Sequence, residues 1–79
     1  MDYLQQSKSI LSDCLGIPFS AIKADSTLEA LKPGLDSITF VSIMIEVEKR
    51  AGNEIPVTEW LELETTADLA KILERNSRK

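Results

Sequence analysis

Ser37 and its neighbours are the part of the sequence whose residue types best suit chemistry. The serine follows Gly34, Leu35 and Asp36, and a largely apolar run begins directly after it at Ile38. A hydroxyl in this setting could act as a nucleophile, lie among metal-binding acids, cap a helix, or accept a phosphate-linked group. Each use requires different companion residues, so the rest of the chain can distinguish them.

The nucleophile and the metal site lack the companions that they require. A serine nucleophile needs a general base, but the chain has no histidine, and the segment lacks the second glycine of a G-x-S-x-G elbow. There is no D-x-D-x-D-G loop, and Asp36 has no close acidic neighbour in the sequence. Cys14 is the one cysteine, and its apolar surroundings indicate a small core residue. The sequence therefore predicts neither an enzyme nor a metal site.

The two remaining uses both place Ser37 at the start of a helix. As a plain N-cap, either Asp36 or Ser37 would accept a hydrogen bond from an unpaired backbone N–H. The same N–H groups and the helix dipole would also favour a phosphate attached to the serine. Gly34 would relieve crowding as another protein approaches, and Asp36 would offer a fixed charge to a basic partner.

The helix that starts at Ser37 should run to Ala51 and end at Gly52. At helical spacing its apolar residues form two groups. The group predicted to face the core consists of Phe40, Ile43, Met44, Val47 and Ala51. A second group, the apolar strip, consists of Ile38, Val41 and Ile45. The strip is either part of an unusually wide buried face or a solvent-facing surface kept for a partner.

Two helices are predicted before this one. The first covers Asp2 to Leu15 and stops at Gly16. A long connection follows, from Ile17 to Leu35, and should contain a short helix. Ser26, with Glu29 three residues later, is the predicted cap of that short helix.

Two further helices are predicted after Gly52. Thr58 should cap a short helix that carries Trp60, which we interpret as a core residue. The last helix should begin at Thr65, with Asp68 completing a variant of the capping box.

Composition and charge limit the class of protein. A chain of 79 residues, 43% of them hydrophobic, should form one domain, 1–79, with an all-α fold of three principal helices plus short ones. The net charge of −4 and the scattered bases argue against a nucleic-acid partner. The sequence shows no signal peptide and no long apolar stretch, so we expect a cytoplasmic protein that does not enter a membrane.

The segment GLDSITFVSIMIEVEKRAGNEIP resembles the phosphopantetheine-attachment region of acyl carrier proteins. The similar features are Gly34, Leu35, Asp36, Ser37, the apolar residue at 38, the EIP at 54–56 and the two threonines that open the last helix. The similarity extends from Leu28 to Leu73. It implies a small four-helix bundle of the acyl-carrier type, in which a phosphopantetheinyl transferase joins the arm of coenzyme A to Ser37.

The resemblance also implies a function without catalysis. The thiol of the covalent phosphopantetheine would carry acyl groups as thioesters between acyl-loading and acyl-processing enzymes of a fatty-acid, polyketide or related specialised pathway. Asp36, Ile38, Val41 and Ile45 would recognise these partners. The length suggests separate partner enzymes, and Met1 favours a complete, discrete carrier protein. We expect this carrier to be a monomer. The alternatives are an aminoacyl or peptidyl carrier of the nonribosomal type, and an unmodified helical protein-interaction module.

Two departures from the family pattern concern the approach to Ser37 and the charge of its helix. Lys32 and Pro33 are two extra residues before Gly34, so this loop should have its own shape. Thr39 and Ser42 stand where acids are common, which predicts weaker steering toward strongly basic enzymes and favours a specialised pathway.

Overall fold

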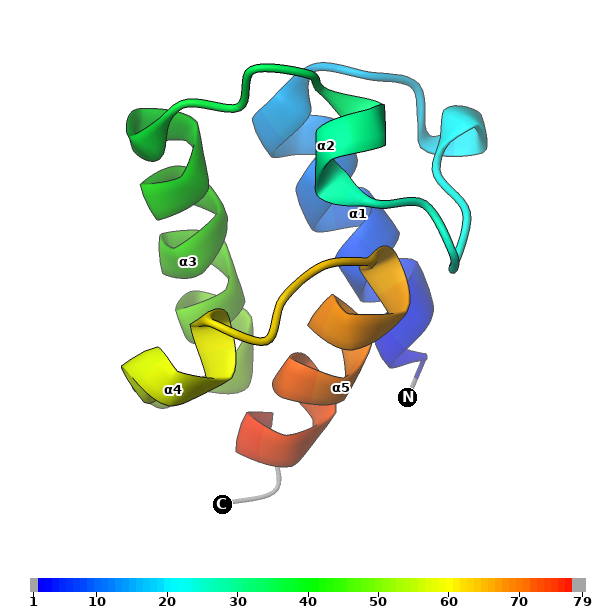
Figure 1. Cartoon of the computed structure of the whole chain (residues 1–79). Helices are drawn as coiled ribbons and strands as arrows, with labels where there is room; N and C mark the ends of the chain where they lie inside the picture. Colours follow the sequence, from blue (N-terminus) through cyan, green and yellow to red (C-terminus); the bar gives the residue numbers. More distant parts are fainter. Residues whose placement is uncertain (1, 78–79) are drawn as a thin grey trace.

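The chain forms three long helices joined by connections that contain shorter helical turns (Figure 1). This computed structural model describes residues 2–77. In chain order the helices are α1 (Tyr3–Leu15), the 3-10 turn η1 (Phe19–Ala21), α2 (Leu28–Leu31), α3 (Ser37–Ala51), α4 (Val57–Trp60) and α5 (Thr66–Ser77). Over the described range no strand forms, and one isolated bridge pairs Thr27 with Thr65. The predicted all-α fold of three main helices is confirmed.

The long helices pack because each has one apolar face. Helix α1 lies along α5 and against α3, and α3 also contacts α5 (Figure 1). Apolar side chains from the three helices and the connections form one core. Its buried members are Ile10, Leu11, Leu15, Ile22, Leu28, Ile43, Val47, Ala51, Ile55, Trp60, Leu69, Ile72 and Leu73. Trp60 is thus a core residue, as predicted.

Helix α1 ends at Leu15 as predicted and begins at Tyr3, one residue after the predicted start, and both ends carry local signals. The Asp2 carboxylate accepts the Gln5 N–H at 3.1 Å, and Gly16 takes the left-handed conformation, with φ of 69°, that ends the helix. Cys14 packs partly buried against the core, and burial is the first cause that raises the pKa of its thiol. It is therefore a packing residue, as the sequence predicted.

The connection from α1 to α3 is fastened to the start of α5. Backbone hydrogen bonds run from Leu28 N to Glu64 O, from Thr66 N to Ser26 O and from Ala67 N to Ala24 O, at 2.9–3.0 Å. The predicted Ser26 cap of α2 is wrong. Thr27 performs that role and accepts the Ala30 N–H at 3.1 Å, whereas the Ser26 hydroxyl accepts from Lys23 N.

The two helices after Gly52 start in different ways. At α5 the predicted capping box is confirmed, because Thr65 N donates to Asp68 and Asp68 N donates to Thr65 Oγ1. The predicted Thr58 cap is wrong, because α4 follows Pro56 with no side-chain cap and Thr58 lies inside the helix. Pro56 is the N-cap residue of α4, and its side chain has no oxygen that could accept a backbone N–H.

Candidate functional site

Ser37 is the first residue of α3, and its side chain is exposed. The cap is supplied by Asp36, whose carboxylate accepts the Thr39 N–H at 2.7 Å. Of the two residues that could have capped this helix, the structure therefore assigns the task to Asp36. The Ser37 hydroxyl is left without a structural task at the helix start, so it is free for chemistry.

The start of α3 also offers unused backbone donors beside Ser37. The first backbone hydrogen bond of the helix runs from Phe40 N to Asp36 O at 3.1 Å. The N–H groups of Ser37 and Ile38 precede that bond, so they remain available to an acceptor outside the helix. A phosphate on the Ser37 oxygen would lie close to these donors and to the positive end of the helix dipole.

The charge beside Ser37 is a stable carboxylate. The backbone N–H of Thr39 is the main cause that lowers the pKa of Asp36, with smaller contributions from the Thr39 side chain and the charge of Lys32. Asp36 is fully exposed, so it is an ionised group that a basic partner can reach. The recognition role of Asp36 stays a prediction.

The loop before Ser37 leaves the serine accessible. Gly34 adopts a φ of 75°, and no atom lies within 4 Å of the position that a Cβ would occupy. Glycine is needed here for the backbone conformation, because an L side chain is strained at this angle. The space on this side of Gly34 is open.

The apolar strip lies in solvent along α3. The exposed fractions of Ile38, Val41 and Ile45 are 77%, 48% and 50%. The reading of a widely buried helix is therefore wrong, and the alternative of a solvent-facing strip is confirmed. Core-facing Ile43, Val47 and Ala51 are buried, as predicted, while Phe40 and Met44 are partly buried against the core.

A shallow apolar hollow joins Ser37 to the head of this strip. It measures about 270 Å³ and is lined by Ser37, Ile38, Val41 and Ser42. The Ser42 hydroxyl is not free to donate a hydrogen bond into the hollow, because it donates to Ile38 O at 3.2 Å. The structure thus brings the predicted attachment and recognition residues together, except that Ile45 lies farther along the helix. An apolar group attached to Ser37 could rest there.

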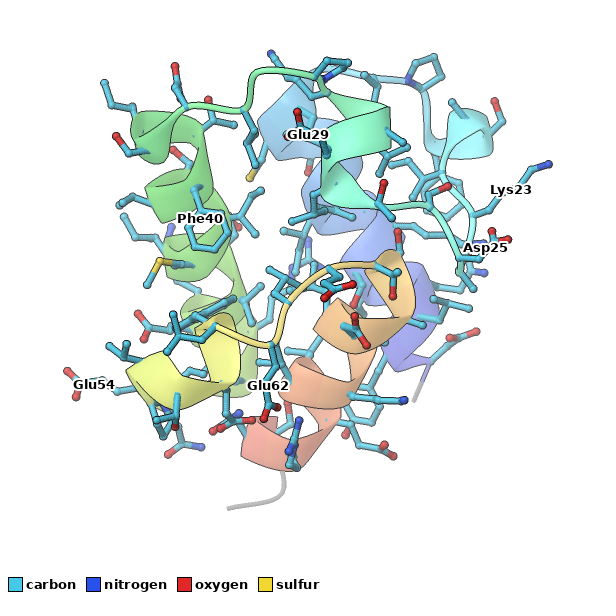
Figure 2. The ribbon with its side chains drawn as sticks, viewed as in Figure 1. Lys23, Asp25, Glu29, Phe40, Glu54 and Glu62 are labelled. Carbon is cyan, nitrogen blue, oxygen red and sulfur yellow. The ribbon has the colours of Figure 1, made fainter. Side chains whose placement is uncertain are left out.

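A second hollow of about 430 Å³ lies on the other side of α3, between this helix, α2 and the turn before α5. Its lining combines four apolar side chains with the polar Thr27, Glu29 and Glu64. It is lined by Thr27, Leu28, Glu29, Leu35, Phe40, Leu63 and Glu64. Phe40 points from α3 toward this space, with Glu29 on the α2 side (Figure 2). The Trp60 ring meets Phe40 edge-on, with ring centres 6.2 Å apart, and supports that wall.

The sequence did not predict this second hollow. Phe40 was assigned to the core, which is half correct because the ring is only partly buried. The hollow depends on tertiary contacts, which the sequence pattern does not reveal. The hydrogen bonds between the long connection and the start of α5 bring α2 and the 63–64 turn together beside α3.

The described range contains neither a metal site nor a membrane-spanning helix. Residues 2–77 contain no group of acids or cysteines arranged to hold a metal ion. None of the helices that the structure describes is long and apolar enough to cross a membrane. The exposed Ser37 hydroxyl and the hollow beside it are suited to holding and presenting a group attached to the serine.

Comparison with known proteins gives two matches. A family model described as "Phosphopantetheine attachment site" matches residues 8–73. The chain is also similar to the non-reducing polyketide synthase Preu3 of Preussia isomera, with 37% identity over 73 residues. The match covers 92% of this chain but only 3% of that protein, so the chain spans a small part of its relative's length.

Proposed function

The chain belongs to the family of phosphopantetheine attachment-site domains, and from this premise we propose that Ser37 is its attachment residue. Domains of this family are carriers with a covalently bound phosphopantetheine, and they are not enzymes. The observation that carries the proposal is the division of tasks at the start of α3. Asp36 caps the helix, while the adjacent Ser37 hydroxyl is exposed and unused.

The residues around Ser37 fit the group that the family carries. Attachment forms a bond between Ser37 Oγ and the phosphorus of the arm while the pyrophosphate bond of coenzyme A breaks. The adenosine bisphosphate half of coenzyme A leaves with the electron pair of that bond, and the hydroxyl proton is released. The free N–H groups of Ser37 and Ile38 can hold the phosphate oxygens, and the shallow hollow can receive an apolar part of the arm. The bound arm supplies a thiol that carries cargo as a thioester.

Partner enzymes are proposed to dock along α3. The exposed strip of Ile38, Val41 and Ile45 would be covered by an apolar groove, and Asp36 would meet a basic group near the attachment point. The phosphopantetheinyl transferase and the enzymes that load and process cargo would share this surface. Docking raises the effective concentration of the tethered cargo at each active site.

The proposed cargo is a growing polyketide. The similar protein is named as a non-reducing polyketide synthase, which supports this cargo over a fatty-acyl, aminoacyl or peptidyl group. The larger hollow beside Phe40 offers apolar walls to an uncharged part of such a chain. Cargo analysis of the protein isolated from its source would test this directly, by the mass of the thioester released with hydroxylamine.

The first experiment is intact-protein mass spectrometry after incubation with coenzyme A and a broad-specificity phosphopantetheinyl transferase. Wild type should gain one phosphopantetheine, and Ser37→Ala should gain none. No gain on wild type, with a transferase that modifies a known carrier in parallel, would favour the unmodified interaction module instead. A discrete carrier would migrate near 8.8 kDa in extracts of its source, whereas a synthase-embedded domain would migrate far above that mass.

A further inference from the structure

The small hollow beside Ser37 belongs both to the attachment point and to the apolar strip. It is lined by Ser37 and Ser42 together with Ile38 and Val41, which are the first two members of the strip. Attachment of the arm removes the hydroxyl hydrogen of Ser37, and the Ser42 hydroxyl already donates to Ile38 O at 3.2 Å. In the arm-bearing carrier the hollow would therefore offer apolar surface without a free hydroxyl donor, which suits an apolar occupant.

The phosphopantetheine arm has a branched apolar group next to its phosphate. A single methylene separates the phosphate ester from a carbon that bears two methyl groups. The amides and the thiol follow farther along the arm. Because Ser37 itself lines the hollow, attachment brings the dimethyl carbon close to Ile38 and Val41.

The larger hollow is less suitable for this part of the arm. Ser37 is not among the residues that line it, and its lining includes the carboxylates of Glu29 and Glu64. A carboxylate that a methyl group covers loses water without gaining a hydrogen bond. The position next to the phosphate and the apolar lining therefore both favour the small hollow.

We propose that, when no partner is bound, the dimethyl segment of the arm lies in the small hollow against Ile38 and Val41. This inference rests on the proposed function of Ser37. The exposed fractions of the two side chains are 77% and 48%, so both have apolar surface that the methyl groups can remove from water. Partners are proposed to dock on the same side chains. The arm would therefore cover part of the docking surface until a partner displaces it.

The arm would be held weakly in this position, as displacement by a partner requires. Removal of two methyl groups from water in a shallow hollow favours the covered form by about tenfold at most. The freedom that the arm loses reduces this preference to a few-fold. A partner that buries the whole strip gains more apolar contact than the arm gives up.

NMR spectroscopy of protein that bears an arm with isotope-labelled methyl groups tests the placement. Wild type, Ile38→Ala, Val41→Thr and Ile45→Ala are loaded from labelled coenzyme A by the broad-specificity transferase, and intact mass verifies complete loading. In wild type, nuclear Overhauser contacts should join the methyl groups of the arm to Ile38 and Val41. The methyl signals should also differ in frequency from those of free phosphopantetheine.

The variants separate the hollow from the rest of the strip. Ile38→Ala removes much of the wall, and Val41→Thr keeps the shape of the side chain while it places a hydroxyl there. Both should lose most of the contacts, and their arm signals should move toward those of free phosphopantetheine. Ile45→Ala is the matched control, because Ile45 belongs to the strip but does not line the hollow, and it should keep the wild-type spectrum.

A soluble gadolinium chelate measures whether the arm covers the strip. The chelate speeds the relaxation of methyl groups that are exposed to solvent. In wild type, attachment of the arm should reduce this effect at Ile38 and Val41 and leave it unchanged at Ile45. Equal effects before and after attachment at all three residues would show that the arm does not cover the strip.

The results that would overturn the inference differ from those that would overturn the proposed function. If wild type takes up the arm but the methyl signals coincide with those of free phosphopantetheine, the arm does not occupy the hollow. Contacts of the methyl groups with Phe40 in place of Ile38 and Val41 would assign the segment to the larger hollow, and would equally overturn the inference. If wild type takes up no arm while a known carrier is modified in parallel, the proposed function itself fails.

Discussion

Asp36 and Ser37 are adjacent, yet they have separate tasks at the start of α3. The Asp36 carboxylate accepts the Thr39 N–H at 2.7 Å and closes the first turn. A serine that capped the helix would lose that hydrogen bond when its oxygen was modified, and the first turn would be weakened. Because Asp36 is the cap, modification of Ser37 should leave α3 intact.

Replacement of Asp36 separates its cap from its charge. Asp36→Ala removes both, so we expect a lower melting temperature and slower attachment of the arm. Asp36→Asn should keep most of the cap, because asparagine caps about as well as aspartate, but it should still slow attachment if a basic partner group contacts the charge. Transferase kinetics and thermal melts measure the two effects. Equal attachment rates in all three proteins would rule out a charge contact at residue 36.

The Asp36 carboxylate should also make stability depend on pH. Its pKa is lowered in the folded state by the Thr39 N–H, so folding favours the ionised form. This stabilisation is present above the unfolded pKa of about 4 and is lost as the pH falls through the lower folded value. Wild type should therefore lose its advantage over Asp36→Asn on acidification below about pH 4, as followed by thermal melts. A constant difference would contradict the assigned cap.

Helix α3 has two apolar faces, one buried in the core and the other exposed to solvent. Its limits were predictable from the sequence because Asp36 and Gly52 are strong local signals. The exposure of the second face was not predictable. Periodicity places Ile38, Val41 and Ile45 beside the core face, but it does not show how far the core extends. That limit is set by where α1 and α5 pack, which is a property of the assembled helices.

A charge on the apolar strip should block docking without unfolding the helix. Val41→Asp should reduce kcat/KM for arm attachment about tenfold or more, because the partner groove would bury an unpaired carboxylate. Its circular dichroism should match wild type, since Val41 is 48% exposed. Val57→Asp is the matched control, because Val57 is also exposed but lies on α4. If Val41→Asp is loaded as fast as Val57→Asp, the strip is not the docking surface.

The two threonine caps proposed for the last helices differ in the structure and should differ in energy. Thr65→Ala removes the hydroxyl that accepts the Asp68 N–H, and it should lower the free energy of unfolding by about 1 kcal/mol. Thr58→Ala should change it by less than about 0.5 kcal/mol, because Thr58 is exposed and caps nothing. Urea denaturation measures both. Equal losses would contradict the assigned starts of α4 and α5.

For the molecule as a whole, stability rests on a core drawn from all three long helices. A domain of this size is stabilised by only about 4–12 kcal/mol, so one cavity matters. Leu69→Ala, at a fully buried position, should cost about 2–5 kcal/mol and unfold a large part of the protein at moderate temperature. Leu61→Ala, at a residue that is 79% exposed, should be nearly neutral. Chemical denaturation of the two variants makes the comparison, and similar costs would refute this core.

The sequence predicted the parts of the molecule that depend on near neighbours. Helix periodicity, the glycine stops and the Thr65–Asp68 box are local, so the long helices and the position of Ser37 could be read directly. The cap of α2 could not, since Ser26 and Thr27 are both good caps and the choice depends on a contact with Thr66. The hollow beside Phe40 and the reach of Lys32 to Leu15 have the same origin, because each joins segments that are distant in sequence. The start of α4 was missed although its signal, Pro56 directly before Val57, is local.

The hydrogen bonds that fasten the first connection to α5 have a consequence for folding kinetics. Ser26 O accepts from both the N–H and the hydroxyl of Thr66, across a separation of 40 residues. Contacts between residues so far apart in the sequence stabilise the fold only after a large loop has closed. They therefore slow folding relative to a bundle with local contacts alone. The three long helices should therefore form early in refolding, and the wall of the larger hollow should form last. The chain is then a helical scaffold before the larger hollow is complete.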